Sequence, residues 1–199
     1  ILDPLILTPT VTTPVSCATN DGVVSVNTTG GSGNYVYNID GGAYALVASF
    51  PNLASGPHII GVKDTTTLCD VFATITLQAA TLITGFDLAT TPVTCNGGFD
   101  GTITATMFTP APGVNDNPVY TYTLTGTSIT GTVLNLGPQD SPLFSGLEAS
   151  DVNGYTVVVT SARNCNETKT IVVTQPAPIV VPAPTVVQFG CTSGNTGNL

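Results

Sequence analysis

Residues 101–107 read Gly101-Thr102-Ile103-Thr104-Ala105-Thr106-Met107, and residues 120–125 read Tyr-Thr-Tyr-Thr-Leu-Thr. In both stretches apolar side chains alternate with hydroxyl side chains, which is typical of half-buried antiparallel strands. The stretches are separated by turns rich in glycine, proline, asparagine and aspartate, so we predict an all-β fold. The side chains expected to point inward are Val24, Val26, Tyr35, Tyr37, Ile39, Ile103, Ala105, Met107, Tyr120, Tyr122 and Leu124.

The chain is organised as repeats. Residues 13–17 (Thr-Pro-Val-Ser-Cys) match residues 91–95 (Thr-Pro-Val-Thr-Cys), and each match is followed by an Asp-Gly pair and a strand pattern. We expect a β-sandwich repeat in residues 1–80, a second one with loop insertions in 81–178, and the start of a truncated third in 179–199. Short strands of this spacing indicate immunoglobulin-like sandwiches. Because the junctions are short and proline-containing, the tandem repeats are expected to form a semi-rigid rod.

The cysteines follow the repeat. Cys69 and Cys95 are 26 residues apart, as are Cys165 and Cys191, and the fifth cysteine is Cys17. We expect one disulfide inside each repeat, Cys17–Cys69 and Cys95–Cys165, with Cys191 pairing to a residue beyond the chain. Buried free thiols are the alternative, and a metal site is disfavoured because the chain lacks a Cys-x-x-Cys motif. Disulfides predict an oxidising, extracellular location.

The charge balance excludes several classes of partner. Three Lys and Arg oppose twelve Asp and Glu, for a net charge of −9, and only 8% of the residues are charged. Nucleic acid and anionic membrane surfaces are therefore not expected as partners, because nothing neutralises their phosphates. Nor do we expect membrane insertion, since no apolar run approaches the length of about 18 residues that a spanning helix requires.

Catalytic chemistry is not expected. His58 is the only imidazole, no Gly-x-Ser-x-Gly motif is present, and His58 itself is expected to be exposed or on an edge strand. We predict no enzyme activity, no catalytic residue and no cofactor. Asp21, Asp100 and Asp116 are weak candidates for calcium ligands, but aspartate beside glycine more often shapes a turn, and we favour that role.

Residues 93–101 (Val-Thr-Cys-Asn-Gly-Gly-Phe-Asp-Gly) and 154–160 (Gly-Tyr-Thr-Val-Val-Val-Thr) resemble the SprB-type repeat of large cell-surface adhesins in gliding Bacteroidota. The first repeat departs from that pattern, with Pro-His-Ile-Ile at residues 57–60 where Gly-Tyr-Thr-Val is expected. The resemblance implies export by the type IX route and display as filaments that serve attachment or gliding motility. Asp64-Thr65-Thr66 also fits a short O-glycosylation signal of exported Bacteroidota proteins, which makes Thr65 a glycosylation candidate.

Two functions of different classes follow. The first is a non-catalytic stalk segment of an extracellular adhesin filament, clamped by disulfides, whose partners are neighbouring repeats and, beyond them, surface glycans or like filaments. The alternative is a carbohydrate-binding module region of a secreted multidomain protein. The absence of tryptophan and the core pattern of the tyrosines favour the first. A third arrangement is donor-strand assembly through residues 4–7 or 179–181.

Overall fold

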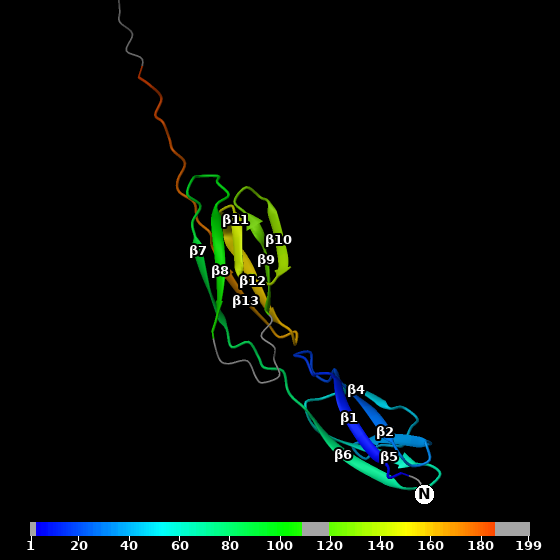
Figure 1. Cartoon of the computed structure of the whole chain (residues 1–199). Helices are drawn as coiled ribbons and strands as arrows, with labels where there is room; N and C mark the ends of the chain where they lie inside the picture. Colours follow the sequence, from blue (N-terminus) through cyan, green and yellow to red (C-terminus); the bar gives the residue numbers. More distant parts are fainter. Residues whose placement is uncertain (1–2, 109–119, 186–199) are drawn as a thin grey trace, which may run out of the picture.

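The computed structural model describes residues 3–108 and 120–185, and within them every regular element is a strand. Two sandwiches follow one another along their long axes (Figure 1). In the first the strands are β1 (Ile6–Thr13), β2 (Gly22–Thr29), β3 (Tyr35–Ile39), β4 (Ser49–Leu53), β5 (Gly56–Asp64) and β6 (Asp70–Leu77). In the second they are β7 (Phe86–Thr91), β8 (Gly101–Met107), β9 (Tyr120–Ser128), β10 (Val133–Gln139), β11 (Leu143–Leu147), β12 (Ser150–Ser161) and β13 (Asn166–Ile171).

The first sandwich packs the antiparallel sheet β1-β2-β4 against the sheet β3-β5-β6. Its core forms where the inward side chains of the two sheets meet, because alternation along each strand sends one residue in two to that side. The buried members of this core are Val15, Val24, Leu53, Ile60 and Leu77.

The second sandwich repeats the plan, with sheet β11-β8-β7 against sheet β10-β9-β12-β13. The predicted inward residues Ile103 and Leu124 are fully buried in its core, and Ala105 and Tyr122 lie beside them. Strand β10 falls in the loop insertion of this repeat. In the first sandwich that edge carries only an isolated bridge between Tyr37 and Ala45. The prediction of an all-β, tandem immunoglobulin-like fold is confirmed.

The strand directions define two ends for each sandwich. In the first, β1 and β6 both run toward the second sandwich, and residues 78–85 connect Leu77 to Phe86. Ile83 of this connection packs against the second core. Because Ile6 and Leu7 already pair with Thr29 and Thr28 of β2, the predicted donor segment 4–7 is in use within its own sandwich.

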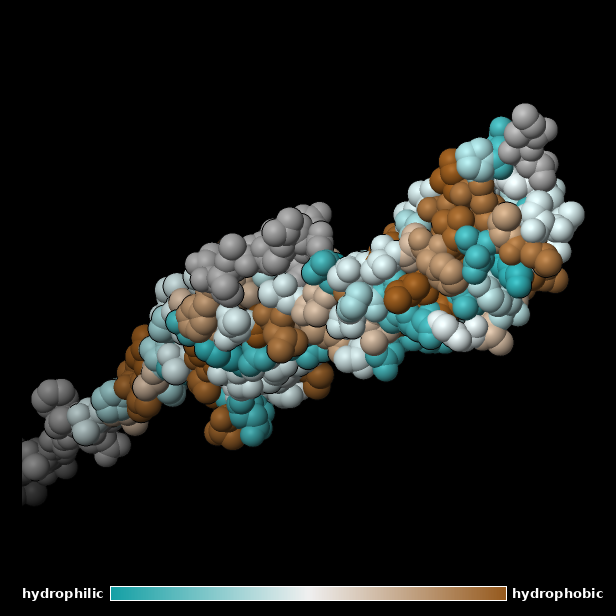
Figure 2. Space-filling view, turned by 90° about the horizontal axis from the view of Figure 1, so that it is seen from below, coloured by the Kyte–Doolittle hydropathy of each residue, from teal (hydrophilic) through white to brown (hydrophobic). Residues whose placement is uncertain are grey.

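The surface carries small apolar areas set among polar ones. Figure 2 shows brown areas interspersed with teal and white over both sandwiches, and brown residues along the narrow segment that leaves the second. That segment includes Ile179, Val180 and Val181, all at least 80% exposed. The described residues contain no helix of the length and apolarity that crossing a bilayer requires.

Candidate functional site: the junction between the two sandwiches

A disulfide joins the two sandwiches. Cys17, in the connection between β1 and β2, is bonded to Cys165, in the turn between β12 and β13, across 148 residues and with a Cα–Cα distance of 5.0 Å. The predicted pairs Cys17–Cys69 and Cys95–Cys165 are therefore wrong. Cys69 and Cys95 are free thiols and exposed, so they are not buried thiols either. Cys191 and its predicted partner lie outside the described residues.

The predicted pairs fail for a geometric reason. Cys69 immediately precedes β6, whereas Cys17 lies at the other end of that strand, in a pocket it shares with Ala79 and Ala80. The eight residues of β6 span about 26 Å. A disulfide needs Cα atoms within about 7 Å, so the two cysteines of one repeat cannot meet. In the second repeat the six residues of β13, which span about 20 Å, separate Cys165 from the loop of Cys95 in the same way.

Hydrogen bonds accompany the disulfide. The Cys17 amide donates to the carbonyl oxygen of Arg163 at 2.9 Å, and the Arg163 guanidinium Nη1 donates to the carbonyl oxygen of Val15 at 2.6 Å. Arg163 is only 8% exposed. Arg163 is thus buried at the junction, where the disulfide and these hydrogen bonds join the two sandwiches. Sequence reasoning missed Arg163, because one arginine in a turn carries no pattern.

Asp21 shapes the loop that presents Cys17. Its carboxylate accepts hydrogen bonds from the Ser16 hydroxyl and from the Ser16 amide, the latter at 2.7 Å. These two bonds hold the pKa of Asp21 below its usual value, and the bond from the Ser16 hydroxyl has the larger effect. The positive charge of Arg163 lowers the pKa a little further.

Asp100 repeats this arrangement in the second sandwich. It accepts from the Thr94 hydroxyl at 2.5 Å and the Thr94 amide at 3.0 Å, and its pKa is lowered by the same two bonds. Asp21 and Asp100 lie in different sandwiches, and Asp116 lies outside the described residues. In the part of the chain that the structure describes, no three His, Cys, Asp or Glu side chains gather as a metal site needs. The geometry supports the turn-forming role.

Asp64 orders the turn that presents Cys69. Its fully buried carboxylate accepts from the Ser32 hydroxyl at 2.7 Å and from the amides of Ser32, Thr66 and Thr67. These bonds, with the Ser32 hydroxyl as the largest cause, hold the pKa of Asp64 far below its usual value. The neighbouring Thr65 is exposed, and its hydroxyl donates to the Asn34 carbonyl at 3.2 Å. Glycosylation of Thr65 stays a prediction.

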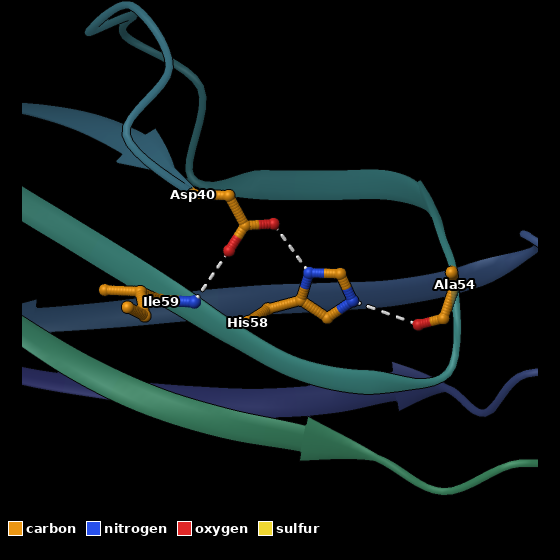
Figure 3. A network of polar contacts seen from close by, with 4 residues as sticks. All are labelled: Asp40, Ala54, His58 and Ile59. Atoms are coloured by element: carbon orange, nitrogen blue, oxygen red, sulfur yellow. Dashed lines mark hydrogen bonds and ion pairs between the residues drawn. The ribbon is translucent and has the colours of Figure 1, made fainter.

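His58 stabilises a loop through hydrogen bonds, and the residues of this hydrogen-bond network include no nucleophilic side chain. Its Nδ1 lies 2.7 Å from Asp40 Oδ2 and its Nε2 lies 3.0 Å from the Ala54 carbonyl oxygen. The Ile59 amide donates to Asp40 Oδ1, and Figure 3 shows all three contacts. The expectation of an exposed or edge-strand histidine is wrong, because β5 is the central strand of its sheet and the side chain is 12% exposed. The bond to Asp40 is the main cause that raises the pKa of His58, and the Ala54 carbonyl adds to it.

Exposed aromatic side chains are dispersed. Among the described residues, Tyr44 and Phe72 belong to the first sandwich, whereas Phe99 and Phe108 flank the two ends of β8 in the second. The strand between them alone spans about 23 Å. A sugar-stacking platform needs several aromatic rings close together on one face, and the rings of Phe99 and Phe108 are too far apart to form one. Their placement disfavours the carbohydrate-binding alternative.

The fold and its junction define a class: tandem immunoglobulin-like sandwiches cross-linked between neighbours. The family model of the SprB repeat matches residues 10–44 and 88–128, one segment in each sandwich. Each sandwich thus contains a segment that matches the SprB repeat, and the resemblance predicted from the sequence motifs is confirmed. The matched segments include Cys17 and Cys95 with the strands on either side of them. No curated protein matches the chain in sequence.

Two solved structures align with most of the chain. Domains A168–A170 of titin align over 76% of this chain and 59% of theirs, at 14% identity and a TM-score of 0.35. The fibronectin(III)-like modules of Clostridium thermocellum CbhA align over 84% of this chain and 95% of theirs, at 11% identity and a TM-score of 0.33.

Proposed function

We propose that this chain is a non-catalytic stalk segment of an extracellular surface adhesin, and that it carries tension between a surface anchor and a binding part elsewhere in the protein. The observation that carries the proposal is the Cys17–Cys165 disulfide between two sandwiches. A covalent link between two domains limits how far the chain can extend under load, because the chain between the two cysteines, which are 148 residues apart, carries no tension while the bond is intact. Force-bearing is the task to which such a link is suited.

The same bond supports an extracellular location. A stable disulfide requires an oxidising compartment, and the SprB-repeat resemblance points to the cell surface of Bacteroidota. We propose export by the type IX route and a role in attachment or gliding motility. The low charge of the chain, 8% of residues, suits a spacer that avoids strong electrostatic contacts. Its proposed partners are neighbouring repeats, with surface glycans or like filaments beyond them, and neither nucleic acid nor the membrane interior.

Surface display and function can be tested on intact cells that produce the chain. Brief protease treatment of unlysed cells should release peptides of residues 1–178 into the medium, and an in-frame deletion of these residues should lower attachment to a surface. Release only after lysis would contradict the stalk function. Retention of the folded chain on a glycan array, with unchanged attachment of the deletion strain, would favour the carbohydrate-binding alternative.

A further inference from the structure

The two free cysteines are the repeat counterparts of the two bonded ones. Cys95 occupies in the second sandwich the position of Cys17 in the first, after the matching Thr-Pro-Val-Ser/Thr segment. Cys69 occupies in the first sandwich the position of Cys165 in the second, in the turn before the last strand. The observed disulfide therefore uses the loop cysteine of one repeat and the turn cysteine of the next, and leaves one of each kind unpaired.

The turn of Cys69 has the backbone geometry of the bonded turn. The Asp64 amide donates to the Cys69 carbonyl at 2.9 Å, as the Ser161 amide donates to the Cys165 carbonyl at 2.8 Å. In both turns the residue before the cysteine has a left-handed backbone, with φ of 62° at Leu68 and 56° at Asn164. In both, the cysteine Sγ lies 4.0 Å from the carbonyl oxygen two residues earlier. Cys69 is thus held as Cys165 is held, without a partner.

The loop of Cys95 is likewise set as the loop of Cys17 is. The residue before each cysteine is fixed by an aspartate, Asp100 for Cys95 and Asp21 for Cys17. The Cys17 amide donates a hydrogen bond to the Arg163 carbonyl of the neighbouring repeat. The Cys95 amide has no acceptor among the described residues, which is the state expected of the same loop without a neighbour.

The free thiols lie at opposite ends of the pair of sandwiches. Ser32 and Thr66, which bond to Asp64 in the turn of Cys69, lie at the end where the chain enters, since Gly31 donates to the Asp3 carbonyl. The loop of Cys95 lies at the end where the chain leaves, since Gly97 donates to the Gln175 side chain at 2.8 Å. The two cannot bond within one chain.

The exit end also exposes apolar surface. Val152 is 95% exposed and Ile129 55%, and both line a pocket of about 410 Å³ with Gln175. Beyond it the chain exposes Ile179, which follows the second sandwich as Ile83 follows the first. Ile83 packs on the core of the next repeat, and Ile179 has no such cover among the described residues. The exposed apolar surface at this end is suited to contact with another repeat.

We propose that the junction seen at Cys17–Cys165 recurs along an array of repeats. Cys95 forms a disulfide with the turn cysteine of the next repeat in line, and Cys69 forms one with the loop cysteine of the repeat before it. The partner that the chemistry fits is a second SprB-type sandwich, represented by another copy of this chain. In the new junction the Thr67 carbonyl takes the place of the Arg163 carbonyl as acceptor for the Cys95 amide.

The bond-forming step needs an oxidant. The Cys95 and Cys69 thiols lose two protons and two electrons as the S–S bond forms, and a small-molecule disulfide such as oxidised glutathione accepts them and becomes two thiols. The inference rests on the tandem-repeat part of the proposed function and on neither adhesion nor gliding. Surface release by protease and attachment test the latter, so the two can fail separately.

The test uses the full chain in a Cys191→Ser background, so that only the two thiols in question vary. One variant adds Cys69→Ser and keeps Cys95, and the other adds Cys95→Ser and keeps Cys69. Each is incubated alone and in an equimolar mixture in a glutathione redox buffer, and the dimers are mapped by peptide mass spectrometry. The Cys17–Cys165 peptide is checked in every sample.

We expect the mixture to yield a Cys69–Cys95 dimer in several-fold excess over the two symmetric dimers together. A matched control moves the thiol by three residues, in a Thr66→Cys/Cys69→Ser chain, whose exposed cysteine should lose that excess. Random pairing would make the mixed dimer only as abundant as both symmetric dimers combined. The inference would be overturned by random pairing or by the absence of dimers. It would equally be overturned if the control kept the excess of the mixed dimer, or if Cys17 exchanged away from Cys165.

Discussion

The junction disulfide predicts how the chain responds to force. When the ends of the oxidised chain are pulled, the load passes from Cys17 to Cys165 through the S–S bond, and the 148 residues of the loop stay unloaded. Only β1, β13 and the flanking segments can be peeled away. Because a fully extended residue spans 3.3–3.6 Å, reduction should release about 50 nm of additional length. The folded Cα–Cα distance of 5.0 Å subtracts almost nothing from it.

The assay is single-molecule force spectroscopy with handles on tags outside residues 1–199, in the presence and absence of a reductant. The oxidised chain should give short extensions only, and the reduced chain, or a Cys17→Ser/Cys165→Ser chain, should give two large unfolding steps. Disulfides within each repeat would instead release two loops of about 18 and 24 nm. Those two lengths, or domain-sized steps from the oxidised chain, would refute the reasoning.

Three further predictions concern stability. Arg163→Ala removes the donor to the Val15 carbonyl and should lower the free energy of unfolding by about 1–3 kcal/mol in denaturant titrations, whereas Lys169→Ala, which removes a half-exposed ion pair, should change it by less than about 1 kcal/mol. Because the pKa of His58 is raised in the folded chain, the protonated imidazole should stabilise the first sandwich fully at pH values below 6.5, the usual pKa of histidine, and this gain should be lost as the pH rises through the folded pKa. A His58→Gln chain whose melting temperature varies with pH as much as that of the unaltered chain would contradict this. Leu124→Ala, at a fully buried position, should cost about 2–5 kcal/mol, and Val133→Ala, on the paired strand but 77% exposed, close to none; equal losses in the two would disprove the assigned core.

The strands and the repeat could be predicted from the sequence, because both depend on local pattern. Alternation at Ile103 and Leu124 places them inward whatever the partner strand is, since the period of a strand is two. The roles of Asp21 and Asp100 were also accessible, because an aspartate a few residues after a serine or threonine bonds within its own loop. The burial of Asp64 was not, because its partner Ser32 lies 32 residues away.

The sequence by itself determined which cysteines are equivalent, and the tertiary structure alone decided which of them pair. Equivalence is read from the matching segments around Cys17 and Cys95. Pairing depends on distance, and β6 holds Cys17 and Cys69 at opposite ends of one sandwich. Residues 78–85 are short enough to bring the next turn, with Cys165, against the Cys17 loop. A repeat pattern cannot distinguish a bond within a repeat from one between neighbours, because both join the same two positions, and only the packing of one sandwich on the next separates them.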